Sequence, residues 1–235
     1  MKKIASKTLV AFGVMGLVAL GAGSASATTY TGSLTSGAGI TGTNAWADNL
    51  TLSWTVDDTT NPGFWTYTYE FQDNDPGQQK ELSHLIIETS ASFTASDIHA
   101  DTPDVSADSP KTFDPSDPSN PNLPGSIYGV KWNVPDADDG TDWTATLVTA
   151  RAPVWGDFYV KDGKTDGSDN AAWNTGFLDA DPLDLPANGS LNNHALVPDT
   201  YTTPVPEPGT LLLVGTGLAS AGAWGRKRWF RRTSA

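Results

Sequence analysis

The chain has 235 residues, no cysteine and a formal net charge of −13 at pH 7. Without cysteine, a disulfide scaffold, a thiol nucleophile and a cysteine-rich metal site are excluded, so packing alone has to hold the fold. The 27 acidic residues outnumber the 14 basic ones, and such a charge balance repels nucleic acid, which excludes a role in binding DNA or RNA.

The N-terminus has the pattern of a secretory signal peptide. Three lysines precede a nearly uninterrupted apolar run from Leu9 to Ala22, and the small residues Ala25 and Ala27 follow this run. Basic, apolar and small-residue regions in this order direct a protein to Sec-type export machinery. We therefore predict a signal helix over residues 1–27, with cleavage after Ala27.

Residues 28–197 form the candidate globular domain, and their hydrophobic pattern is that of β-strands. Apolar residues alternate with polar ones over 50–56 and over 65–71, which is the period of a strand with one buried face. The segment 57–63 between them is rich in Asp, Asn, Pro and Gly, so the two strands should form a hairpin. Further strands are predicted over 82–89, 92–95, 127–134, 143–149 and 158–161, and a weaker one over 173–178.

No segment of the domain shows an apolar stripe at helical spacing over three turns, so the fold is predicted to be all-β. Many short strands separated by Gly, Pro, Asn and Asp turns favour an antiparallel β-sandwich, jelly-roll-like in topology. Trp54, Trp65 and Trp143 lie on the apolar phase of their strands and are assigned to the core.

One segment does not follow this pattern of short strands and turns. Residues 101–125 contain six prolines among Asp, Ser and Asn residues. Loops longer than about 15 residues are unusual in compact domains and are either functional or disordered. The low apolar content predicts a disordered loop, or one packed loosely on the surface.

The candidate catalytic residues show no recognisable signature. The histidines are His84, His99 and His194, and they are too scattered to predict a zinc site, so a structural role is favoured. Glycan hydrolysis needs two carboxylates about 5 to 9.5 Å apart. The least arbitrary carboxylates are Glu70, Glu81 and Glu88, which lie in or beside predicted strands. No serine-hydrolase motif is present, and we predict that the protein is not an enzyme.

Two kinds of ligand remain candidates. Acidic turns favour calcium over other ions, although none fits an EF-hand loop and solvated turns are the alternative. The calcium candidates are Asp136, Asp138, Asp162 and Asp166, and no other cofactor is predicted. Sugar rings stack on exposed aromatic side chains, which makes Trp155 and Trp173, near predicted loops, the candidates for glycan contact; core filling is the alternative.

The C-terminus combines three features in a fixed order after a Pro-rich linker at 198–204. Residues 205–208 are Val-Pro-Glu-Pro, residues 210–224 are apolar, and residues 225–232 are basic. The apolar span predicts a transmembrane helix, but a short one. Its residues make about 22 Å of helix, whereas a comfortable span needs roughly 20 residues. The basic residues that would stop it on the cytoplasmic side are Arg226, Lys227, Arg228, Arg231 and Arg232.

This order of motif, apolar span and basic stop over residues 205–235 resembles the PEP-CTERM sorting domain. The resemblance implies processing by an exosortase, a membrane enzyme of Gram-negative bacteria that make extracellular polysaccharide. Pro206, Glu207 and Pro208 would be its recognition signal, as substrate residues. Segments such as 65–69 and 154–159 are similar to the acidic β-sandwich ectodomains of such proteins, which implies an extracellular domain without an assigned activity.

These observations predict an exported, non-enzymatic protein of the outer surface or extracellular matrix, associated with extracellular polysaccharide. Its tail would be held transiently or permanently in the inner membrane. The alternatives are a secreted glycan-active enzyme and a calcium-dependent glycan-binding module. An enzyme should show a cleft with convergent carboxylates, whereas an interaction module should show exposed aromatic faces or sheet edges.

Overall fold

The structure is a computed structural model that describes residues 27–74, 82–102, 107–134 and 142–198. All of them belong to one compact unit, Ala27–Val205. The predicted signal helix, the C-terminal tail with its basic stop, and the calcium candidates Asp136 and Asp138 lie outside the described residues. Within the described ranges, no helix has the length and apolarity needed to cross a membrane.

The described part of the chain is all-β, as predicted, with two short 3-10 helices. The strands are β1 (Thr29–Ser36), β2 (Gly39–Gly42), β3 (Leu50–Asp57), β4 (Trp65–Asp73), β5 (Leu82–Glu88), β6 (Ala100–Asp101), β7 (Lys111–Phe113), β8 (Ile127–Asn133), β9 (Asp142–Thr149), β10 (Pro153–Gly156), β11 (Phe158–Thr165), β12 (Ser168–Asn174) and β13 (Ala195–Pro198). The 3-10 helices are η1 (Ala45–Asp48) and η2 (Ala95–Asp97). The weaker strand predicted over 173–178 overlaps only the end of β12.

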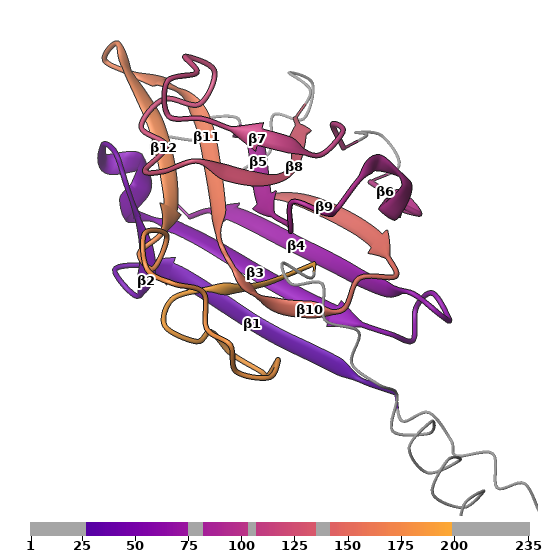
Figure 1. The fold of residues 1–235 in the computed structure, drawn as a ribbon. Helices are drawn as coiled ribbons and strands as arrows, with labels where there is room; N and C mark the ends of the chain where they lie inside the picture. The colour runs from indigo at the N-terminus through magenta and orange to yellow at the C-terminus, as the bar shows by residue number, and fades with distance from the viewer. Residues whose placement is uncertain (1–26, 75–81, 103–106, 135–141, 199–235) are drawn as a thin grey trace, which may run out of the picture. The chain divides into compact units, whose positions relative to one another are not determined.

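Eleven strands form one continuous sheet in the order β6-β9-β4-β3-β1-β2-β12-β11-β5-β8-β7 (Figure 1). β10 pairs with β13 in a small second sheet. β1 and β2 pair in parallel over two residue pairs, and the other strand pairs are antiparallel. The large sheet is curled, so the structure differs from the predicted two-sheet, jelly-roll-like sandwich. The reason is the pairing of β2 with β12, which joins the two halves by backbone hydrogen bonds.

The β3–β4 hairpin confirms the alternation seen in the sequence. In β3 the apolar positions are buried, and Trp54 is 2% exposed. Trp54 lies opposite Gly32 of β1, where a Cβ atom would collide with the indole ring, so the glycine makes room for it. Trp143 is also buried as predicted, whereas Trp65 is only partly buried.

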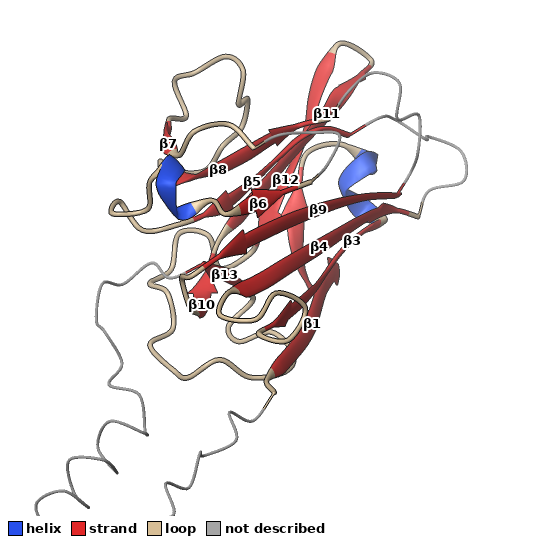
Figure 2. Ribbon diagram, turned by 90° about the vertical axis from the view of Figure 1, so that its right-hand side faces the viewer, coloured by secondary structure: helices blue, strands red, loops and turns tan. Residues whose placement is uncertain are grey.

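The core lies on the inner face of the curled sheet. Residues of β3 and β4 share one buried cluster with Leu85 and Ile87 of β5 and with Trp132 of β8. β13 packs against β1, β3 and β5, and its four residues are buried (Figure 2). The Tyr69 hydroxyl donates a hydrogen bond to the carbonyl oxygen of Leu196 in β13, at 3.0 Å, which fixes this last strand to the core.

A second buried cluster lies on the opposite face of β5, and it corrects the expectation for residues 101–125. Phe113 and Leu123 are 2% and 4% exposed and pack in this cluster with Tyr159 of β11. The Tyr159 hydroxyl donates to the carbonyl oxygen of Pro121 at 2.6 Å. Residues 111–113 and 120–125 are therefore held on the sheet, so the prediction of disorder or loose packing is wrong for them, whereas residues 114–119 between them are exposed.

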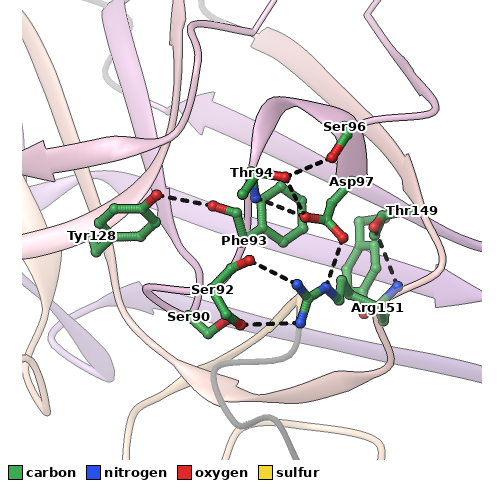
Figure 3. A network of polar contacts seen from close by, with 10 residues as sticks. Ser90, Ser92, Phe93, Thr94, Ser96, Asp97, Tyr128, Thr149 and Arg151 are labelled. Atoms are coloured by element: carbon green, nitrogen blue, oxygen red, sulfur yellow. Dashed lines mark hydrogen bonds and ion pairs between the residues drawn. The ribbon is translucent and has the colours of Figure 1, made fainter.

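The segment 92–95, predicted as a strand, forms a turn that leads into η2. Arg151 holds it: its Nε donates to Asp97 Oδ1 at 2.9 Å, and its Nη2 donates to the Ser92 carbonyl oxygen at 2.9 Å (Figure 3). The prediction is wrong because the side chain that fixes this turn comes from a residue more than 50 positions away.

Candidate functional site

Four titratable side chains meet beside the small β10–β13 sheet. Glu88 ends β5, Asp157 lies between β10 and β11, and His194 directly precedes β13. Asp181 lies in the irregular segment between β12 and β13. Of these, Asp157, Asp181 and His194 have ligand atoms that all lie within 4.8 Å of one another. Among the described residues they are the group of three that could hold a cation together.

Asp157 is fixed by hydrogen bonds from both of its neighbouring strands. Its backbone N–H donates to Glu88 Oε2 at 2.8 Å, and the Glu88 N–H donates to the Asp157 carbonyl oxygen at 3.0 Å. Its Oδ1 accepts a hydrogen bond from Asn174 Nδ2 at 2.7 Å, and Asn174 in turn accepts from the Phe158 N–H at 3.1 Å. The Asp157 carboxylate therefore has a defined position and orientation.

Two glycines allow these side chains to approach the backbone. A Cβ atom on Gly156 would lie 2.9 Å from Glu88 Oε2, and one on Gly176 would lie 2.7 Å from His194 Cε1. A Cβ atom would come even closer to Val197 at position 156 and to the Asn192 carbonyl oxygen at position 176, so a larger residue at either position would force the surroundings of these side chains to move.

The His194 ring is completely buried and faces the two aspartates. Its Nδ1 lies 3.3 Å from the Leu191 carbonyl oxygen. Its Nε2 lies 3.6 Å from Asp157 Oδ1 and 3.7 Å from Asp181 Oδ1. These separations exceed the 2.7–3.2 Å of a hydrogen bond, and Nε2 has no hydrogen-bond partner within the described residues.

Burial and neighbouring carboxylates oppose ionisation of the acidic groups in this cluster. Burial, followed by the charges of Asp181 and Asp157, raises the pKa of Glu88 to about 8. Burial also raises the pKa of Asp157 to about 7, with Asp181 adding to the effect. The pKa of Asp181 is raised by burial too, although His194 acts in the opposite direction. A bound cation would favour the ionised forms of all three carboxyl groups.

The calcium candidates within the described residues do not converge. Asp162 is buried on β11 and its Oδ1 accepts the backbone N–H of Gly163, whereas Asp166 is exposed in the β11–β12 turn. Among the described residues, no group of three His, Asp or Glu side chains at ligand spacing contains either of them.

The two tryptophans proposed for glycan contact have different surroundings. Trp155 belongs to the core cluster through β10 and is 1% exposed, which agrees with core filling, the alternative named above, and not with an exposed sugar platform. It still borders a cavity of about 500 Å³. The other residues lining this cavity are Asp184, Leu185, Ala187, Asn188, Ser190 and Leu191. Trp173 is partly buried in β12, and its contact with glycans stays a prediction.

The sequence named Glu88 and His194 as separate candidates and missed Asp157 and Asp181. The structural interpretation of His84 agrees with its burial on β5, and the His99 ring stacks on Phe64 with 4.0 Å between centroids. His194, also expected to be structural, instead points at two carboxylates. No sequence motif predicts that these four residues lie together. Successive members of the cluster Glu88, Asp157, Asp181 and His194 are 69, 24 and 13 positions apart.

Comparison with known families places the PEP-CTERM protein-sorting motif at residues 204–228. The match contains Pro206, Glu207 and Pro208 and begins at residue 204, after the described part of the chain ends at residue 198. It implies an exported protein that an exosortase processes and sorts to the cell surface. The resemblance found in the sequence is thereby confirmed.

No curated protein matches the sequence significantly. Among solved structures, the chain is similar to the KRT10-binding region domain of the pneumococcal serine-rich repeat protein PsrP, with 13% identity and a TM-score of 0.23. The alignment covers 66% of this chain and 91% of that one. A similarity of this strength defines neither the fold nor the ligand.

Proposed function

We propose that the chain is a non-enzymatic protein of the cell surface or extracellular matrix whose β-domain associates with extracellular polysaccharide. The sorting motif at residues 204–228 is the observation that carries this proposal, since it implies export and exosortase processing. In this proposal residues 1–27 are the signal peptide, residues 198–204 are a linker, and the tail is held in the inner membrane before sorting.

The charge of the domain indicates which polysaccharide fits. Only six basic residues accompany the 27 acidic ones between Thr28 and Pro208, because the other eight lie in the two ends of the chain. An acidic surface repels acidic polymers at low salt. The proposal therefore favours a neutral polysaccharide over one rich in uronic acids or sulfate.

The cavity beside Trp155 is the contact that we assign to the polysaccharide. Its wall combines polar side chains, such as Asp184 and Ser190, with Leu185, which is 85% exposed. Sugars present both hydroxyl groups and apolar C–H faces, and binding sites for them pair apolar surface with a few polar groups. An exposed leucine next to polar side chains supports such a contact.

The test is binding of the purified full chain to neutral and to uronic-acid-rich polysaccharide, measured by co-sedimentation. We expect saturable binding to the neutral polymer, weakened at least fivefold in Leu185→Ala. The matched control is Leu178→Ala, which removes a leucine that is 75% exposed but does not line the cavity. Equal binding by both variants would contradict the role of the cavity, and no binding to any extracellular polysaccharide would contradict the proposal.

A glycan-active enzyme is the second candidate, and one observation favours it. Glu88, Asp157 and Asp181 converge, as the carboxylates of a glycoside hydrolase do. The same purified chain should then release reducing ends from a polysaccharide, and Glu88→Gln should abolish this release. The third possibility is a calcium-dependent glycan-binding module. It is tested by adding calcium to the binding assay and by chelating it.

A further inference from the structure

The spacing of the buried cluster matches that of ligands around a metal ion. In a tetrahedral site with ligand bonds of about 2.0–2.2 Å, neighbouring ligand atoms lie about 3.3–3.6 Å apart. His194 Nε2 lies 3.6 Å from Asp157 Oδ1 and 3.7 Å from Asp181 Oδ1. We propose that Asp157, Asp181 and His194 form a binding site for a divalent transition metal ion of the Zn²⁺ class.

The orientation of His194 is the independent observation that points to a cation. When Nδ1–H donates to the Leu191 carbonyl oxygen, Nε2 carries a lone pair, and this lone pair faces two carboxylates. Such an arrangement is repulsive unless a proton or a metal ion lies between the groups. The side chain is completely buried, and Nε2 has no hydrogen-bond partner within the described residues.

The surroundings are those of a supported metal site. Metal-bound histidines usually donate their other ring N–H to a carbonyl or carboxylate oxygen, which fixes the ring, and Leu191 provides this oxygen. Ligating carboxylates are usually hydrogen-bonded in turn, and Asn174 donates to Asp157 Oδ1 at 2.7 Å. The Asn174 amide is itself oriented by the Phe158 N–H.

The donor set selects the class of ion. Calcium takes six to eight oxygen ligands, and magnesium prefers oxygen ligands and bound water, so an imidazole nitrogen with two carboxylates suits neither well. Imidazole nitrogen suits Zn²⁺ and its first-row neighbours. The side chain of Asp181 is 16% exposed, so the site opens to solvent on its side. A water molecule would complete the coordination.

A bound metal ion would link the irregular segment between β12 and β13 to the neighbouring strands. Asp181 lies inside the segment between β12 and β13, whereas Asp157 and His194 directly adjoin strand ends. The same segment supplies Leu185 and most of the wall of the cavity. The ion would therefore hold the wall of this cavity in place, whatever ligand the cavity accepts.

The test uses the full chain, freed of metal with EDTA and titrated calorimetrically with Zn²⁺. We expect one ion per chain and at least a tenfold loss of affinity in Asp181→Asn. The matched control is Asp179→Asn, which removes the same charge from an exposed position two residues away and should bind within twofold of the parent. Millimolar Ca²⁺ should not displace the ion.

Two further measurements keep the outcome clear if a variant folds poorly. Circular dichroism in EDTA reports whether each variant is folded before metal is added. Co²⁺ bound to the parent chain should give the strong visible absorption of tetrahedral coordination, and His194→Gln should change that spectrum. The proposal is overturned by equal Zn²⁺ affinity of Asp181→Asn and the parent, by absent saturable binding, or by a Co²⁺ spectrum that His194→Gln leaves unchanged.

Discussion

His84 is a buried imidazole that the fold keeps neutral. It is 3% exposed on β5, and its ring centroid lies 5.8 Å from that of Tyr159. Burial, followed by the charges of Lys131 and Lys161, lowers the pKa of His84 to about 3, while a hydrogen bond that the ring donates to the Asn120 side chain acts in the other direction. The charged and titratable groups around it are Lys131, Lys161, Asp117 and Tyr159.

This lowered pKa makes stability depend on pH. The unfolded chain takes up a proton at His84 near pH 6.5, whereas the folded chain does so only near pH 3, so the contribution of His84 to the free energy of unfolding falls as pH decreases below 6.5. Between pH 7.5 and pH 5 the loss from His84 is about 2 kcal/mol. Urea unfolding at both pH values should show a change in unfolding free energy from pH 7.5 to pH 5 that is about 2 kcal/mol less favourable in the parent chain than in His84→Met.

The comparison between the two proteins is what isolates His84. The buried carboxyl groups have raised pKa values and contribute with the opposite sign, but they are common to both proteins. An equal change in unfolding free energy for parent and His84→Met would show that His84 does not titrate in this way.

At the scale of single elements, β8 and β5 show how closely neighbouring strands are packed. Gly129 pairs with Glu88 of β5. A Cβ atom at position 129 would collide with the carbonyl oxygen of Ile87 and would lie 3.3 Å from the Ile86 side chain. A backbone oxygen inside a paired strand cannot move aside as the end of a long side chain can.

We expect Gly129→Ala to lower the free energy of unfolding by about 2 kcal/mol or more, because the two strands must separate to admit the methyl group. The control is Gly163→Ala on β11, where a Cβ atom meets nothing within 4 Å and the change should stay within about 0.5 kcal/mol. Denaturant unfolding measures both, and a Gly129→Ala variant as stable as the control would contradict this account.

The alternation of apolar and polar residues predicts some strands and fails to predict others. The β3–β4 hairpin follows from alternation, since every second residue of β3 is apolar and buried. β1 was missed because its Thr-, Ser- and Gly-rich residues are mostly exposed and Leu34 alone is fully buried. β13 has four residues, too few to show a period, and its Pro198 was assigned to the linker. Sequence gave no means of finding Asp157 and Asp181, because only the pairing of β10 with β13 and the course of the irregular segment bring them to His194.

For the molecule as a whole, charge is divided unequally along the chain. Three of the 14 basic residues precede Thr28 and five follow Gly225, whereas all 27 acidic residues lie between these positions. Removal of both ends would therefore leave a domain far more acidic than the full chain. High net charge of one sign favours solubility and opposes self-association.

The sorting motif should control where this acidic domain is found. In a host with an exosortase, replacing Pro206, Glu207 and Pro208 with alanine should leave an unprocessed chain in the membrane fraction, because the recognition signal is lost. Cell fractionation with immunoblotting measures both size and location. The same replacement at Thr202, Thr203 and Pro204 is the control and should be processed normally. Unchanged processing and location of the motif variant would refute the sorting role of these three residues.

β13 has a mechanical consequence for a protein handled by its tail. The strand ends at Pro198, and the residues from there to Pro206 reach at most about 25–30 Å when fully extended. A pull along the tail therefore acts first on a strand held by four residue pairs with β10 and by the Tyr69 hydroxyl. Because β13 begins directly after His194, tension strong enough to peel it away would also take His194 from the two aspartates it faces.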